Sequence, residues 1–245
     1  LKRLISSILF LILIMHIYGI ICIGGYSMKK FFTTFLIIIQ CFSLFISSIL
    51  AVIFYVCFDI NFYKEFYQKE NIANYIDTSS DNLINNTQNL LNYLNKKEQL
   101  NTDWFSEKDI LHMVDVQNLY TFSHSIMIYC FITFILSTII IILILRGKSL
   151  LYITKIFNKV LLLFIVLVGG LSAVIAYNFN SFWIKFHTTL FSNDLWLLSP
   201  SESNLIKMVP EEFFISLITK IIIYILILFV AMFIGNVIIR KKLTK

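Results

Sequence analysis

Residues 31–58 read FFTTFLIIIQCFSLFISSILAVIFYVCF, a run of 28 residues without a charged side chain. A helix rises about 1.5 Å per residue, so about 20 apolar residues are enough to cross the roughly 30 Å hydrocarbon core of a bilayer. Three further apolar runs, 120–145, 157–177 and 213–239, also reach this length. The pattern predicts an all-α membrane protein with a bundle of four transmembrane helices.

The composition and the distribution of charge agree with this prediction. The chain of 245 residues is 58% hydrophobic and 14% charged, whereas soluble domains average about 45–50% and about 25%. Residues 59–122 hold five Lys and ten Asp or Glu, and residues 178–215 hold two Lys and four acids. Most of the other basic residues cluster at the opposite ends of the apolar runs, which is typical of cytoplasmic loops and excludes a nucleic-acid-binding surface. Segments 59–119 and 178–212 are therefore expected outside the cell, with the C-terminus in the cytoplasm.

The first 27 residues do not fit the scheme, because a further span there would place Lys29 and Lys30 on the outer side. Met28-Lys29-Lys30 is typical of a bacterial start before a first span. We expect 1–27 to be an upstream extension outside the working protein, with a signal peptide as the alternative. Residues 28–245 are expected to form one integral membrane domain.

The outer segments carry helix signals, so a mainly helical extracytoplasmic subdomain is expected. Leucines at helical spacing predict an amphipathic helix over 82–97. Ser106-x-x-Asp109 predicts a helix start, and this helix is expected to cover 107–119 and to continue into the second span. Segment 178–212 is rich in aromatic residues, which favour the membrane–water interface, and Pro210 before two glutamates is a further start signal.

Two histidines stand out, because His112 and His187 lie one in each outer segment. A neutral imidazole transfers protons near pH 7, and a carboxylate such as Asp115 or Asp194 would orient it. A hydrogen-bonded structural role is the alternative for each histidine taken alone. Two His and one Asp also match the ligand number of catalytic zinc, but no metal-binding spacing is present, and neither a metal nor another cofactor is expected.

Other chemistries find less support in the sequence. There is no Gly-x-Ser-x-Gly or phosphate-binding loop, and the four cysteines lie in or beside apolar runs. A nucleophilic Cys57 or Cys130 remains an alternative. A transporter would need ionisable groups inside the spans. Lys220 and His124 lie there, but both are near helix ends, so a transporter finds little support. A non-catalytic membrane binding protein and a metal-dependent lipid hydrolase also stay open.

Two stretches resemble one family closely. Residues 104–116, WFSEKDILHMVDV, form one half of the match, and 186–200, FHTTLFSNDLWLLSP, with 208–214, MVPEEFF, form the other. Together they resemble the lipoprotein intramolecular transacylase family, Lit, of Gram-positive bacteria, over about 28–245. The resemblance implies an acyltransferase of the cell membrane that acts on diacylglyceryl-modified lipoproteins. It would move the sn-2 acyl chain to the α-amine of the same N-terminal Cys, which gives the lyso form.

This reaction suits two histidines. An α-amine has a pKa near 7.7–8.0, so a base must remove a proton from it and an acid must protonate the departing glyceryl oxygen. We expect His112 and His187 to transfer these protons and Asp115 or Asp194 to orient one of them. Asn193 or Tyr120 would stabilise the oxyanion. The aromatic residues expected to line the lipid site are Trp104, Trp183, Phe191 and Trp196.

Overall fold

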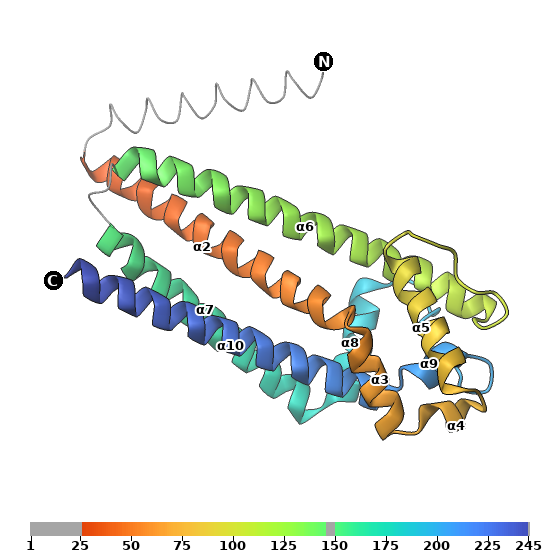
Figure 1. Ribbon diagram of the computed structural model, residues 1–245. Coiled ribbons are helices and arrows are strands. Elements are labelled where there is room, and N and C mark those ends of the chain that lie inside the picture. Colours follow the sequence, from red (N-terminus) through yellow and green to blue (C-terminus); the bar gives the residue numbers. More distant parts are fainter. Residues whose placement is uncertain (1–25, 146–149, 245) are drawn as a thin grey trace, which may run out of the picture. The chain divides into compact units, whose positions relative to one another are not determined.

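The computed structural model describes residues 26–145 and 150–244, and every regular element in these residues is a helix (Figure 1). The helices are α2 (Tyr26–Cys57), α3 (Ile60–Lys69), α4 (Ile72–Ile76), α5 (Ser80–Leu94), α6 (Glu107–Leu145), α7 (Leu150–Tyr177), α8 (Phe179–Leu190), α9 (Asn204–Met208) and α10 (Glu211–Leu243). Four of them, α2, α6, α7 and α10, are long and apolar enough to cross a membrane. The predicted fold class is confirmed. The prediction of an extension at 1–27 lies outside the described residues, apart from the first two residues of α2.

The helix boundaries follow the local signals in the sequence. Helix α6 begins directly after Ser106 and runs without a break into the second apolar stretch, as predicted. Helix α5 takes up most of the predicted 82–97, and α10 begins directly after Pro210. The sequence did not single out α3, α4, α8 and α9, which occupy much of the remaining outer segments.

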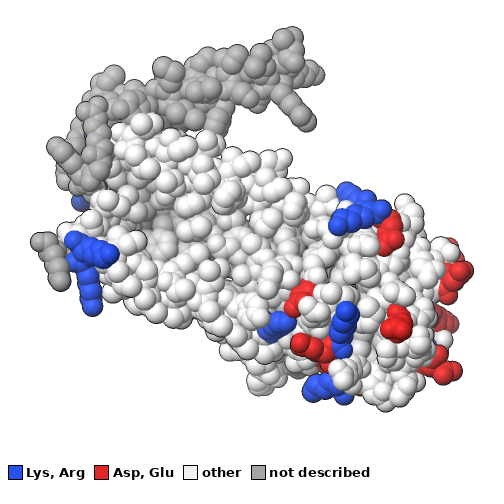
Figure 2. All heavy atoms as spheres, in the orientation of Figure 1, with Lys and Arg blue, Asp and Glu red and all other residues white. Residues whose placement is uncertain are grey.

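The chain divides into two compact units. The first contains the described residues of 1–46, 129–164 and 230–245, and the second contains 47–128 and 165–229. All fourteen Asp and Glu lie in the second unit. On the face drawn in Figure 2, the red acidic side chains gather on its polar segments, and the long apolar helices show a broad uncharged surface.

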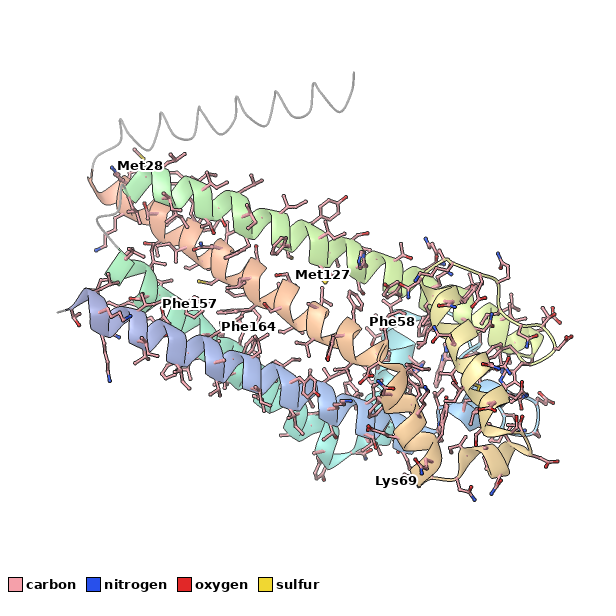
Figure 3. The ribbon with its side chains drawn as sticks, viewed as in Figure 1. Met28, Phe58, Lys69, Met127, Phe157 and Phe164 are labelled. Carbon is pink, nitrogen blue, oxygen red and sulfur yellow. The ribbon has the colours of Figure 1, made fainter. Side chains whose placement is uncertain are left out.

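The first unit is held together by aromatic and polar contacts between its helices. Phe45 of α2 is fully buried and meets Phe157 and Phe164 of α7, with ring centroids 5.3 and 5.1 Å apart; Figure 3 labels both α7 rings. Gln40 donates to the hydroxyl of Thr138 on α6 at 2.6 Å, and Asn236 of α10 donates to the Thr154 carbonyl of α7 at 2.9 Å. Such polar contacts are favourable in an apolar environment, where water does not compete for them.

The second unit has a core of its own, built mainly from aromatic side chains. Phe213, in the first turn of α10, is 1% exposed and packs against Phe62, Tyr63 and Phe66 of α3. Helix α3 is joined to α5 by a hydrogen bond of 3.0 Å between the hydroxyls of Tyr67 and Thr87. These contacts give the outer segments a fixed core, against which side chains from separate segments can be held in place.

Candidate active site

The first turn of α6 is fixed by a capping box. The backbone N–H of Ser106 donates to the Asp109 carboxylate at 3.0 Å, and the backbone N–H of Asp109 donates to the Ser106 hydroxyl at 3.2 Å. The other carboxylate oxygen of Asp109, which is fully buried, accepts from the hydroxyl of Ser203 at 2.5 Å. Ser203 caps α9 by accepting from the Ile206 N–H. One buried carboxylate therefore ties the starts of two helices together.

His112 follows one turn after this anchor. It lies three residues from Asp109 and three from Asp115, so the two carboxylates flank it along the helix. Its side chain is 8% exposed, and its Nδ1 atom is buried without a hydrogen-bond partner. His112 lies eight residues before the apolar run 120–145, which is by itself long enough to cross a bilayer. Burial, and after it the neighbouring His187, lower the pKa of His112 to about 4, against opposing effects of Asp115 and Asp109.

His187 is held by α8. The N-cap of this helix is Asn178, whose side chain accepts from the Ser181 N–H at 2.9 Å. One turn before His187, the carbonyl of Trp183 lies 2.8 Å from its Nδ1. A carbonyl only accepts, so Nδ1 carries the proton and Nε2 of the neutral ring has a free lone pair. Burial lowers the pKa of His187, and the hydrogen bond to Trp183 opposes this.

The two imidazoles lie beside each other in the second unit. Their ring centroids are 6.2 Å apart, although 75 residues of chain separate them. Phe191 contacts both rings, at 5.4 Å from His112 and 5.7 Å from His187. Trp183 packs on His187 edge-on at 4.5 Å, and Trp196 stacks on it at 4.8 Å. Two buried histidines, both with pKa values below 6.5, therefore share an aromatic site.

The loop after α8 closes this site against α6. Asn193 donates to the Asp115 carboxylate at 2.9 Å, and its own side-chain oxygen accepts from the Leu195 N–H at 3.0 Å. Four residues after Asn193, the Leu197 carbonyl accepts from Lys108 at 2.5 Å. These bonds connect both sides of His112 on α6 to the segment that carries Trp196.

The remaining predicted site residues are placed differently. The ring N–H of Trp104 points to the sulfur of Met208 at 3.0 Å, which packs Trp104 on α9. Tyr120 donates to Asn95 at 2.9 Å, and its ring lies 5.1 Å from that of Phe54, so these contacts are with residues other than His112 and His187. Asp194 is exposed. The roles predicted for these three residues stay predictions.

Asp109 and Ser203 were missed as parts of this site. Asp109 was recognised only as a helix-start residue, and Ser203 lies 94 residues away in the sequence, so no local signal joins them.

Within the described residues, no three His, Cys, Asp or Glu side chains are grouped so that they could hold a metal ion. The arrangement is suited to proton transfer by the histidines themselves.

Comparison with known proteins identifies the family. The family model of the lipoprotein intramolecular transacylase Lit matches residues 37–214. The chain belongs to the Lit family. It is accordingly an acyltransferase of lipoproteins and an integral membrane protein, as its four candidate spans indicate. No curated protein matches the chain.

Solved structures of Lit have the same fold. The chain is 23% identical to the membrane integral lipoprotein intramolecular transacylase Lit from Bacillus cereus, with a TM-score of 0.75 over 88% of this chain and 100% of that one. Two further Bacillus cereus Lit structures each carry a substitution of one histidine. The arginine variant is 22% identical with a TM-score of 0.72, over 89% of this chain and 97% of that one. The alanine variant is 23% identical with a TM-score of 0.72, over 91% and 100%.

Proposed function

We propose that this Lit family member moves the sn-2 acyl chain of an S-diacylglyceryl group to the α-amine of the same N-terminal Cys, and that His112 and His187 carry the proton. The observation that supports these roles is the pair itself, two buried imidazoles 6.2 Å apart that come from separate outer segments. The reaction breaks the sn-2 ester C–O bond and forms an amide C–N bond. One proton leaves the nitrogen and one arrives at the glyceryl oxygen, so no other reactant is consumed.

The low pKa values of both histidines suit the first half of the reaction. An α-amine is partly protonated at neutral pH and becomes nucleophilic only when it has lost a proton. Since burial lowers the pKa of both rings, both are neutral at pH 7 and able to accept. We assign the first proton to Nε2 of His187, because the Trp183 carbonyl holds the proton of this ring on Nδ1.

The carboxylates suit the second half of the reaction. Asp109 and Asp115 flank His112 and favour its charged form, whereas a charge on His187 disfavours it. The pair therefore carries one added proton at a time. We propose that this proton passes to His112, which delivers it to the departing glyceryl oxygen. Since amine and ester belong to one substrate, the site supplies orientation rather than a second binding event.

We propose further that the site faces the outer leaflet. All acidic residues lie in 59–122 and 178–215, and basic clusters end the apolar runs on the other side. Around the pair, the exposed apolar side chains of Val114 and Leu190 provide a surface for acyl chains. Membrane lipid and the diacylglyceryl group would meet the histidines here, with Trp183 and Trp196 covering His187.

The test is mass spectrometry of the N-terminal lipopeptide from a host that normally makes diacyl lipoprotein. With the native chain, we expect fragments that place one acyl chain on nitrogen and one on glyceryl. Alanine at either His112 or His187 should lower this product by about 100-fold or more, as loss of a general acid or base does. The double variant should lose little more, because the residues act as a unit.

His124→Ala is the matched control, since it removes a histidine from α6 outside the pair. An unchanged lipopeptide with well-expressed native protein would refute the reaction. Full conversion by both alanine variants would support the proposed reaction but refute the roles of the histidines. A product with a free glyceryl group and no N-acyl chain would indicate a hydrolase.

A further inference from the structure

A hollow beside the histidine pair has no role in the acyl transfer as described. It has a volume of about 320 Å³, near the lower end of ligand-sized pockets. One wall is the first part of α6, with Glu107, Lys108 and Leu111, and the other is the loop before α9, with Leu198 and Glu202. Its lining mixes hydroxyl, charged and apolar side chains, which does not suit an acyl chain.

Both walls of this hollow continue into the histidine pair. On α6, Leu111 precedes His112, and Lys108 lies one turn before His112. On the loop, Leu198 follows two residues after Trp196, which stacks on His187. The hydrogen bond from Lys108 to the Leu197 carbonyl joins the two walls. Along α6 the hollow lies on the side of His112 away from the apolar run that begins at residue 120.

The substrate has one branch that this position fits. The amine and the glyceryl ester must contact the histidines, and the acyl chains must stay against an apolar surface. The third branch is the carbonyl of the modified Cys and the peptide that follows it. This branch is polar and must leave the site toward water. We propose that the hollow binds the first residues after the lipid-modified Cys of the lipoprotein, an inference that rests on the proposed function.

The charges that line the hollow predict a preference among peptides. Glu107, Glu202 and Lys108 sum to −1, and the ammonium of Lys108 is already engaged by the Leu197 carbonyl. Acidic residues after the Cys are therefore disfavoured relative to basic residues. These side chains are exposed, so each pair contributes modestly, and we expect a preference of about two- to fivefold.

The experiment uses the full chain in zwitterionic detergent and three synthetic diacylglyceryl-Cys peptides, which continue with Ser-Lys-Lys, Ser-Glu-Glu or Ser-Ser-Ser. Acyl transfer is followed by mass spectrometry, and kcat/KM is compared between peptides. The native chain should favour the Lys peptide over the Glu peptide, Glu202→Gln should reduce the ratio, and Glu202→Lys should reverse it. Glu98→Lys makes the same charge change at an exposed position away from the hollow and should leave the ratio unchanged.

The outcomes separate the two proposals. Equal rates for the Lys and Glu peptides with the native chain would overturn the peptide site and leave the acyl transfer intact. A ratio that Glu202→Lys does not change, or that Glu98→Lys changes equally, would also overturn it. Turnover of the Ser-Ser-Ser peptide shows that each variant is folded. If the native chain converts none of the three peptides, the proposed function itself fails, and the peptide site fails with it.

Discussion

At the scale of single residues, the surroundings of His112 explain how the site could bind a substrate. It is buried, its Nδ1 has no hydrogen-bond partner, and the carboxylates of Asp109 and Asp115 flank it on the same helix. A buried polar atom without a partner destabilises the folded state. Such an atom is understandable at His112 if a bound substrate supplies the missing hydrogen-bond partner. Helix α6 can hold such a residue one turn after its start because Asp109 in its first turn is fixed by Ser106 and Ser203.

The stability of the protein should depend on this residue in mild acid. The pKa of His112 is about 4 in the folded chain and about 6.5 when unfolded, so between these values the unfolded chain binds more protons. The contribution of neutral His112 to the free energy of unfolding is fully present above pH 6.5 and is lost as the pH falls toward 4. From pH 6.5 to 5 we expect a loss of about 1–2 kcal/mol, or a few degrees in Tm.

Thermal unfolding in detergent at several pH values measures this effect. His112→Gln has no titrating ring, so its Tm should fall less between pH 6.5 and 5 than that of the native chain. His124→Gln removes a histidine elsewhere on α6 and is the control. Equal pH dependence in His112→Gln and the native protein would contradict the assigned pKa.

At the scale of helices, the site depends on where α6 and α8 begin. The start of α6 was predictable, because Ser106-x-x-Asp109 precedes a long apolar run. The aromatic residues of α8 also follow helical spacing at Phe179, Phe182, Trp183 and Phe186, but in the sequence they were interpreted as interface anchors. The pairing of His112 with His187 was anticipated from their positions in the two outer segments. The bond between Asp109 and Ser203 was not, because only the folded chain brings these residues together.

The N-terminal cap of α8 should therefore influence catalysis. Asn178 accepts from the Ser181 N–H, and replacing such a cap by alanine costs about 1 kcal/mol. We expect Asn178→Ala to loosen the turn that holds the Trp183 carbonyl against His187 and to lower the rate of acyl transfer severalfold. Asn178→Asp keeps the acceptor and should restore the rate. Amide hydrogen exchange of α8 should rise in Asn178→Ala alone, and identical exchange and rates in both variants would contradict the role of the cap.

At the scale of the whole molecule, orientation in the membrane follows from charge. The spans were predicted from apolar length alone, and each of the four apolar runs corresponds to one long helix. Which side each segment faces is a separate matter, and it depends on the acids of 59–122 and 178–215 and on the cytoplasmic preference of Lys and Arg. The positions of the acidic segments decide on which side of the membrane the histidine pair would meet its proposed substrate.

Cysteine labelling in intact cells tests this orientation. In a variant without the native cysteines, Lys97→Cys places a thiol on the exposed connection between α5 and α6, and Thr244→Cys places one on the exposed C-terminal end. We expect a membrane-impermeant maleimide to label Lys97→Cys in intact cells and Thr244→Cys only after the membrane is permeabilised. Both variants should retain acyl transfer, since neither position is near the histidines in sequence. The reverse labelling pattern would put the connection that leads into α6 in the cytoplasm, and the His112–His187 pair would then be on the wrong side of the membrane for its proposed substrate.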